Sequence, residues 1–201
     1  MSYKVAKKFW ITRKIYPAYP HNFKRRFLDL SFILNNLDDE KSLLDIGCAD
    51  CSMLILLREL TPIKNLYGVD ISNKLMRKEK GLRLITADVT KKINLPETDI
   101  CLCFGIFPYI FDDDHIYNIL NNIKSNKLLV RAPCALNEEN KHTINKFSKE
   151  LGANYSAIYR TLDSYKVILS KHFDVKEVIR AYPDNIESKY GSKQYYFICK
   201  R

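Results

Sequence analysis

The sequence predicts an α/β fold, a three-layer sandwich around a mostly parallel seven-stranded sheet with an antiparallel last strand. Short apolar runs alternate with helical patterns between residues 42 and 131. Strands that alternate with helices in this way form right-handed βαβ units and a parallel sheet. The last two apolar runs have no helix between them, so we expect these two strands to pair antiparallel.

Ahead of this pattern, the N-terminal segment has no clean period. Pro17 and Pro20 break residues 1–21 into pieces that we expect to be extended. Asn22 is a good N-cap for a helix that follows it, and three acids at positions 38–40 end that helix. Its apolar residues recur at helical spacing on one face. This face consists of Phe23, Phe27, Leu30, Leu34 and Leu37.

The remaining elements follow in chain order. Strands are expected at residues 43–46, 66–69, 82–85, 100–104 and 127–131, and the last pair at 175–180 and 194–199. Helices are expected at 53–60, 73–80, 113–123, 137–151 and 161–171. The first of these helices is strongly apolar, is capped by Ser52 and is closed by Pro62.

Length and composition exclude several protein classes. The chain has 201 residues, of which 46% are hydrophobic and 28% charged, and these values exclude a disordered or collagen-like polymer. No apolar run approaches the ~18 residues of a membrane helix, and the N-terminus lacks the apolar core of a secretory signal. We expect a cytoplasmic protein without a membrane span. A basic arm and helix at 1–40, acting as a lid or substrate cap, would precede one domain at 41–201.

The positive charge is concentrated at the N-terminus. The net charge is +10, and residues 1–28 hold eight Lys and Arg residues and no acid. An excess of this kind points to an anionic substrate or partner. A solubilising arm, or a composition biased toward Lys, explains it equally well.

The six cysteines do not predict a metal site or a disulfide framework. A secreted disulfide scaffold would be shorter and richer in cysteine. Cys48 and Cys51 form a Cys-x-x-Cys pair, but a zinc site needs four ligands, and no second pair of cysteines or nearby histidines completes it. We interpret the pair as structural and expect no metal.

Acids and a glycine lie at the carboxyl ends of the predicted strands, where a ligand would bind. In an open parallel sheet, ligands lie beyond the carboxyl ends of the strands, and Asp45, Gly47, Asp70 and Asp88 fall there. Asp70 comes 23 residues after Gly47, and an acid at the end of the second strand can accept both ribose hydroxyls of a nucleoside. Taken alone, Asp70 is better explained as a solvated acid at a strand end. Their joint spacing favours a nucleoside site.

The turn after the first strand argues against a dinucleotide. Such a site needs Gly-x-Gly-x-x-Gly, so that the pyrophosphate lies on the helix N-terminus. Here the run from Gly47 is GCADCS, which lacks two of the glycines, and Asp50 would repel a phosphate. A cofactor without phosphate fits better.

Four motifs, LLDIGCADC, LYGVDIS, LITADV and DICLCFGIFPYIFDDD, occur in this order. The series resembles that of the class I S-adenosylmethionine-dependent methyltransferases. The resemblance covers roughly residues 40–200 and implies a Rossmann-like domain with S-adenosyl-L-methionine as cofactor. That family usually has Gly at the positions held here by Ala49 and Cys51.

The resemblance also implies where each part of the cofactor lies. Asp70 would accept hydrogen bonds from the ribose, and Asp88 would accept one from the adenine amine. The methionine part would lie on the turn after the first strand, and the sulfonium at the end of the fourth. Asp45, Gly47 and Ala49 are implied for the methionine part, and Asp70 for the ribose. Ile71, Asp88 and Val89 are implied for the adenine, and Phe104 and Gly105 for the sulfonium.

The acceptor site is less defined. Tyr109 follows the fourth strand, where small-molecule members of the family often have His, and could hydrogen-bond the acceptor; a packed aromatic is an equal alternative. His115 lies near the predicted pocket, although an exposed position in the first turn of a helix is the favoured interpretation. Cations and aromatics of the arm and of two later positions are the candidate substrate residues. They are Tyr16, Tyr19, Arg25, Arg131 and Arg160.

We therefore expect an S-adenosylmethionine-dependent methyltransferase that acts on a small polar metabolite or glycan precursor, with an anionic acceptor as one option. The cofactor site is expected to use only residues after Ser42, which leaves the arm to cover the acceptor. Two alternatives stay open, an RNA methyltransferase and a non-catalytic subunit that keeps the fold. Cys134 would suit an RNA cytosine methyltransferase as nucleophile, but the flanking residues of that family are absent. Salt-dependent RNA binding separates the two enzymes, and cofactor affinity separates both from the subunit.

Overall fold

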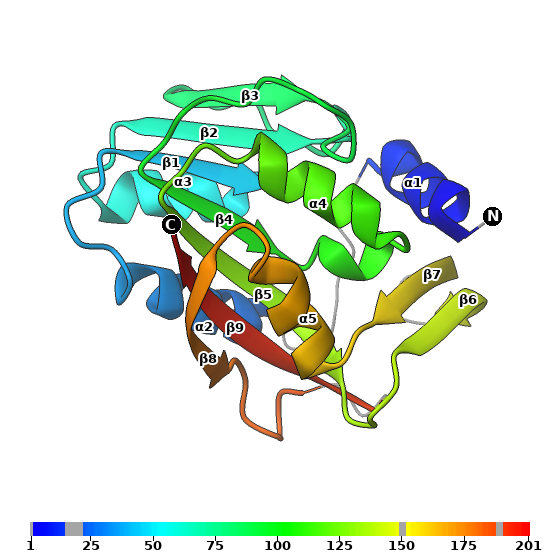
Figure 1. The fold of residues 1–201 in the computed structure, drawn as a ribbon. Coiled ribbons are helices and arrows are strands. Elements are labelled where there is room, and N and C mark those ends of the chain that lie inside the picture. Colours follow the sequence, from blue (N-terminus) through cyan, green and yellow to red (C-terminus); the bar gives the residue numbers. More distant parts are fainter. Residues whose placement is uncertain (1, 15–21, 149–151, 188–190) are drawn as a thin grey trace.

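The computed structural model describes residues 2–14, 22–148, 152–187 and 191–201. Within these residues the core is a seven-stranded sheet in the order β3-β2-β1-β4-β5-β9-β8 (Figure 1). Strands β1 to β5 are parallel, and β9 runs antiparallel to both of its neighbours. This confirms the predicted fold class. The strands are β1 (Ser42–Ile46), β2 (Asn65–Asp70), β3 (Leu82–Thr86), β4 (Ile100–Phe104), β5 (Lys127–Ala135), β8 (Asp174–Arg180) and β9 (Ser192–Lys200).

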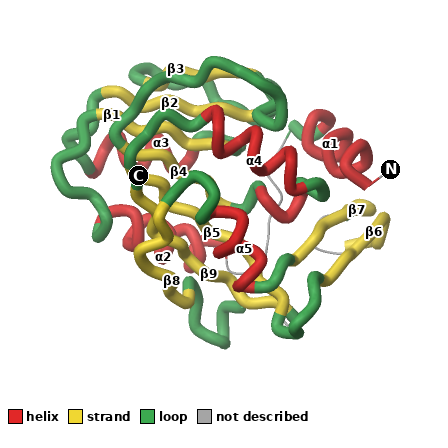
Figure 2. Tube along the Cα trace, in the orientation of Figure 1, coloured by secondary structure: helices red, strands yellow, loops and turns green. Residues whose placement is uncertain are grey.

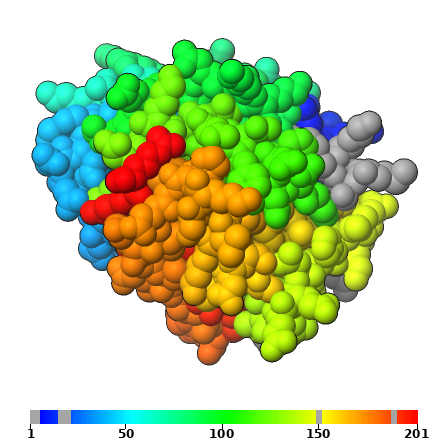
Figure 3. All heavy atoms as spheres, viewed as in Figure 1, coloured from blue at the N-terminus to red at the C-terminus, as the bar shows by residue number. Residues whose placement is uncertain are grey.

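Helices cover both faces of this sheet. On one face lie α2 (Asn22–Leu34) and α3 (Ser52–Leu60), and on the other lie α4 (Asp113–Asn122) and α5 (Leu162–Leu169). Figure 2 shows the same layering by type of element, and Figure 3 shows α4 and α5 packed together over the face that they cover. Each face of the sheet therefore has its own apolar core.

The central strands are apolar on both sides because both faces are covered. Strands β1, β4 and β5 bury nearly every residue. Strands between two helical layers form continuous apolar runs instead of alternating with polar residues, which is why the sequence predicted them. The outer strands β3 and β8 are largely half-buried or exposed.

One helix and one hairpin lie at the edge where the parallel strands end. The helix α1 (Ser2–Thr12) packs against the hairpin of β6 (Lys141–Ser148) and β7 (Ala153–Tyr159) and against the short 3₁₀ turn η1 (Phe107–Tyr109) (Figure 1). The extended backbone predicted for this part of the arm is therefore wrong over residues 2–12, whereas residues 15–21 lie outside the described residues. The helix predicted at 137–151 is also wrong, because residues 141–148 pair with β7, and strand propensity depends on such non-local pairing.

Three local predictions differ from the structure. Residues 73–80 form a turn and irregular backbone instead of a helix; only one of them, Leu75, is buried, so a helix there would lack an apolar face to cover. Ser52 is the first residue of α3, and Cys51 occupies its cap position. On α2, Phe23 and Phe27 of the predicted face are exposed. The residues that α2 buries are Asp29, Leu30, Phe32 and Ile33.

The described helices include none that is both long enough and apolar enough to cross a bilayer. The boundary at residue 40 stays a prediction. By its packing, α2 belongs to the layer that covers the sheet, since its buried residues join the core of α3 and the strands.

Candidate active site

A cavity of about 910 Å³ lies beyond the carboxyl ends of the parallel strands, within the usual range of ligand pockets, ~300–1,000 Å³. The strand ends form its floor, and α1, α2 and the β6-β7 hairpin contribute its walls. Of the predicted site residues, Tyr16 and Tyr19 lie outside the described residues. Twelve others line the cavity. They are Arg25, Asp45, Gly47, Ala49, Asp70, Ile71, Asp88, Val89, Phe104, Gly105, Tyr109 and Arg131.

Two predicted site residues lie elsewhere. Arg160 is buried, and its Nε and Nη2 donate to Asp113 Oδ1 at 2.9 and 2.6 Å, while Nη2 also donates to the carbonyl of Ile110 at 2.9 Å. Arg160 therefore ties the start of α4 to the loop after β4, and the prediction that it binds substrate is wrong. His115 lies half-buried in the first turn of α4 and does not line the cavity.

The turn between β1 and α3 has three residues with left-handed backbone, and only one of them is a glycine. Gly47, Ala49 and Cys51 have positive φ angles of 79°, 47° and 60°, a conformation that costs a residue with a Cβ about 1–2 kcal/mol. Asp70 stabilises the turn, because its carboxylate accepts a hydrogen bond from the amide of Ala49 at 3.0 Å. The same carboxylate accepts the amide of Ser72, just after β2, at 2.8 Å. These two bonds also hold the Asp70 carboxylate at the cavity wall.

Replacing Ala49 by glycine is expected to stabilise the protein, because glycine adopts this φ without Cβ strain. We expect a gain of about 1 kcal/mol, or about 2–4 °C in melting temperature. Ala87→Gly is the matched control: Ala87 also lines the cavity but is not among the positive-φ residues, so glycine there should lower the melting temperature. Scanning calorimetry measures both, and equal losses would show that the turn is unstrained.

Acidic side chains gather on the side of the cavity formed by β1, β2 and β3. They are Asp45, Asp50, Asp70 and Asp88. Burial, together with the nearby carboxylates of Asp70 and Asp50, raises the pKa of Asp45 to about 7. Burial also raises the pKa of Asp70. A bound cation would favour the ionised form of both groups, so this side suits a positively charged ligand.

Helix α1 closes the cavity over the end of β3. Lys7 Nζ donates to Asp88 Oδ2 at 2.7 Å in a largely buried ion pair. Trp10 meets the ring of Tyr109 edge-on, with 5.0 Å between ring centroids. Both Lys7 and Trp10 line the cavity. That the cofactor site uses only residues after Ser42 stays a prediction, and the arm contacts one of these residues, Asp88, through Lys7.

A buried carboxylate, that of Asp29 on α2, organises the opposite side. Its Oδ1 accepts hydrogen bonds from the hydroxyls of Tyr182 at 2.9 Å and Tyr196 at 2.8 Å, and lies 3.1 Å from Arg131 Nε. Burial raises the pKa of Asp29, and the charge of Arg131 opposes that shift. Sequence reasoning missed Asp29, although it is the single acid among residues 1–37. A lone acid within a basic segment was the signal in the sequence that could have identified Asp29 as a buried ion-pair partner.

The cysteines are all free and buried. The Sγ atoms of Cys48 and Cys51 lie 3.9 Å apart beside the β1 turn. Burial raises the pKa of Cys134 to about 12, so it is a neutral thiol near pH 7. A nucleophilic cysteine needs the thiolate, which argues against the RNA cytosine chemistry considered from the sequence.

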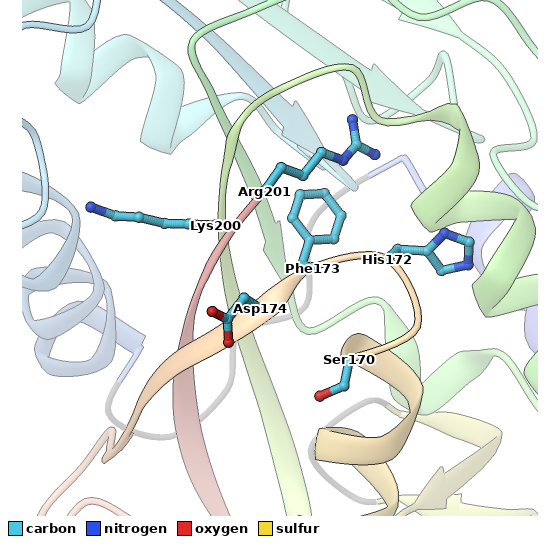
Figure 4. A pocket seen from close by; sticks show the side chains of 6 residues that line it. All are labelled: Ser170, His172, Phe173, Asp174, Lys200 and Arg201. Atoms are coloured by element: carbon cyan, nitrogen blue, oxygen red, sulfur yellow. The ribbon is translucent and has the colours of Figure 1, made fainter.

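A second hollow, of about 430 Å³, lies near the end of the sheet where the parallel strands begin (Figure 4). One of its residues, Lys200, pairs with Lys127 at the start of β5, whereas ligands of parallel sheets bind where the strands end. Arg201 stacks over the ring of Phe173 and donates to the carbonyl of Ile123 at 2.8 Å. Figure 4 shows the labelled side chains diverging, with Lys200 and His172 pointing to opposite sides. This hollow is a poor candidate for the functional site.

No model of a known protein family matches the chain, and no curated protein matches it. Solved structures do match. A Listeria monocytogenes protein assigned to the S-adenosylmethionine-dependent methyltransferases has a TM-score of 0.65 at 18% identity, over 90% of this chain and 100% of that one. Magnesium protoporphyrin IX methyltransferase from Synechocystis PCC 6803, solved with bound SAH, has a TM-score of 0.65 at 16% identity, over 99% of both chains.

A third structure comes from a different kind of methyltransferase. The 1,6-didemethyltoxoflavin-N1-methyltransferase of Burkholderia thailandensis, with its substrate and S-adenosylhomocysteine bound, has a TM-score of 0.67 at 10% identity, over 90% of this chain and 79% of that one. At such identities the similarity establishes the fold. The two enzymes whose names give an acceptor, a magnesium porphyrin in one and a didemethyltoxoflavin in the other, have different acceptors, so the shared fold does not specify an acceptor.

Proposed function

Because the chain has the fold of the S-adenosylmethionine-dependent methyltransferases, we propose that it is an enzyme of this kind, which transfers a methyl group from S-adenosyl-L-methionine to a small polar acceptor. The observation that carries the proposal is the convergence of all nine predicted cofactor residues on one cavity. Three of these nine are aspartates, at the ends of β1, β2 and β3. This donor set suits a cofactor that has a ribose, an adenine amine and a net positive charge.

Each aspartate would hold one part of the cofactor. The Asp70 carboxylate already accepts two backbone amides, and a carboxylate has lone pairs for further bonds from ribose hydroxyls. Asp45 would hold the ammonium of the methionine part. Asp88 would accept the adenine amine in place of Lys7.

The chemistry of transfer needs little from the protein beyond positioning. The cofactor supplies an activated methyl group on a positively charged sulfur. The chain must orient the acceptor and exclude water. Gly105 and Phe104 would border the reacting atoms, and Tyr109, at the adjoining turn, would hold the acceptor by a hydrogen bond. Trp10 packs on Tyr109 and so keeps this ring in place under α1.

The covered cavity supports a small acceptor over RNA. Single-stranded nucleic acid is bound in an open basic groove with stacking aromatics. Here α1 lies across one side of the cavity, where its Lys7 is engaged with Asp88, and the hairpin residues Tyr155 and Tyr159 form another wall. An acceptor that fits under these elements is of metabolite size.

Calorimetric titration of the full-length protein tests the cofactor. We expect binding of S-adenosylmethionine and S-adenosylhomocysteine and no response to NAD; the reverse result would refute the proposal. Methyl-labelled S-adenosylmethionine is then incubated with the low-molecular-mass filtrate of source cells and, separately, with their RNA. Label in the filtrate supports the enzyme proposed here. Label in RNA alone supports the RNA enzyme, and cofactor binding without transfer to either supports a binding subunit.

Replacing Lys7 by methionine is expected to tighten S-adenosylhomocysteine binding by about two- to fivefold, because the adenine amine then no longer displaces Nζ from Asp88. Lys8→Met is the matched control, since the neighbouring Lys8 is exposed and should leave the affinity unchanged. Titration calorimetry compares the two variants with the unmodified protein. Weaker binding in Lys7→Met would mean that Lys7 holds the cofactor instead of competing with it.

A further inference from the structure

The cavity is divided by charge. Its β1-β3 side carries the four aspartates described above, whereas the opposite wall, from α2, β5 and the hairpin, is basic. The basic side chains of that wall are Arg25, Arg131, Lys141 and Lys146. Arg26 of α2 also lines the cavity, but its Nη2 lies 3.7 Å from Asp50 Oδ2, on the acidic side. Two acids accompany the basic side chains of the wall, and burial raises the pKa of both, Asp29 and Glu187. A cationic cofactor on the first side therefore faces a wall that suits an anion.

Arg131 brings a fixed guanidinium to the end of β4. Its Nη1 donates to Gln194 Oε1 at 3.0 Å, its Nε lies 3.1 Å from Asp29, and its guanidinium lies 5.6 Å from the ring of Phe104. A Cβ at Gly105 would lie 3.3 Å from Arg131 Nη2. The absence of a side chain at Gly105 therefore lets the guanidinium reach the backbone that, under the proposed function, borders the reacting atoms.

Arg25 approaches the same place from α2. The guanidinium carbons of Arg25 and Arg131 each lie 5.8 Å from the centroid of one ring, that of Tyr182. Arg25 donates from Nε and Nη2 to the carbonyl of Ile186, at 3.3 and 2.9 Å. This contact orients the guanidinium, but a carbonyl does not neutralise its charge. Two oriented guanidiniums beside a cavity are the arrangement that recognises carboxylate and phosphate groups.

We propose that Arg25 and Arg131, both packed on Tyr182, form the anion-binding subsite for the methyl acceptor, which carries a carboxylate or a phosphate group. The inference rests on the proposed function, which assigns the acidic side of the cavity to the cofactor. Lys141 and Lys146 are exposed on the hairpin and add positive charge at the entrance, which raises the local concentration of an anion. The charge of Arg25 acts on Asp29 and Glu187, but burial raises the pKa of both acids and so disfavours their ionised forms. An anionic acceptor therefore adds a charge-assisted hydrogen bond that a neutral acceptor does not make.

The test uses the full-length protein saturated with S-adenosylhomocysteine and three small probes: benzoate, phenyl phosphate and the neutral benzamide. Trp10 is the single tryptophan of the chain and lines the cavity, so its fluorescence reports binding. We expect at least one anion to bind at least about tenfold more tightly than benzamide, the advantage of a charge-assisted hydrogen bond. The preference between benzoate and phenyl phosphate distinguishes a carboxylate acceptor from a phosphate acceptor.

Arg25→Gln should remove about tenfold of the anion's affinity and leave S-adenosylhomocysteine binding unchanged. Lys124→Gln is the charge-matched control, because Lys124 is exposed after α4, bonded to Asn94 and not part of the cavity wall. Three results overturn the inference: no anion binds, benzamide binds as tightly as both anions, or Arg25→Gln and Lys124→Gln behave alike. If the unmodified protein does not bind S-adenosylhomocysteine, the result counts against the proposed function and not against this inference. That result is obtained before any probe is added.

Discussion

Replacing Asp70 by alanine is expected to weaken S-adenosylhomocysteine binding by at least about tenfold. The change removes two hydrogen bonds from ribose hydroxyls to a carboxylate, together worth about 1.5–3 kcal/mol or more. The fold should survive, because Asp70 lies at a strand end and is not part of the apolar cores. Titration calorimetry measures the affinity, and unchanged affinity would mean that the ribose lies elsewhere.

Asp70 also holds the β1 turn through the amide of Ala49, so the loss of the turn must be separated from the loss of the ribose contact. A thermodynamic cycle does this. S-adenosylhomocysteine and its 2′,3′-dideoxy analogue are titrated into the unmodified protein and into Asp70→Ala. The analogue should bind more weakly than the parent only in the unmodified protein. A penalty of the same size in both proteins would show that Asp70 acts on the turn alone.

Cofactor affinity is expected to fall as the pH falls below 7. The pKa of Asp45 in the free protein is about 7, raised by burial and by the carboxylates around it. The ammonium of the methionine part favours ionised Asp45, so the pKa is lower in the complex. Binding is therefore tightest above pH 7. Below pH 7 the affinity falls by up to about tenfold for each pH unit, and binding near pH 6.5 releases a proton from Asp45. Calorimetry in two buffers of different ionisation enthalpy measures that proton.

Asp45→Asn is the control for this prediction, because an amide does not titrate. Its affinity should vary little between pH 6 and pH 8. The stability of the free protein gives an independent readout. The folded pKa of Asp45 is raised above its ordinary value of 3.8, so the free energy of unfolding declines as the pH rises toward 7. Asp45→Asn should therefore raise the melting temperature more at pH 8 than at pH 4, and an equal rise would assign the titration to another group.

Much of the fold could be predicted because the sheet is buried on both faces. Strands such as β4 are continuous apolar runs, and Asp45 and Asp70 are the next-to-last residue of β1 and the last residue of β2. The floor of the cavity was predictable for the same reason: the carboxyl ends of parallel strands meet at one edge. The motif series supplied the implied role of each residue there.

The walls could not be predicted in the same way, because they depend on contacts between distant segments. Lys7 reaches Asp88 from 81 residues away, and Asp29 meets Tyr196 from 167 residues away. The charge of Arg160 gave no sign that carbonyl groups and Asp113 surround it. The residues of β6 are mostly polar and exposed, so the pairing of this strand with β7 left no periodic pattern in the sequence.

The place of β9 in the sheet has a consequence for folding during synthesis. β9 lies between β5 and β8, and both precede it in the sequence. A chain emerging from the ribosome can therefore assemble β1 to β5, but the edge of β5 stays open until residues 192–200 have been synthesised. Gln194 and Tyr196, the partners of Arg131 and Asp29, arrive with that strand. Until then the nascent chain carries an unpaired, apolar strand edge, which is prone to aggregate, and the basic wall of the cavity is complete only after β9 has joined the sheet.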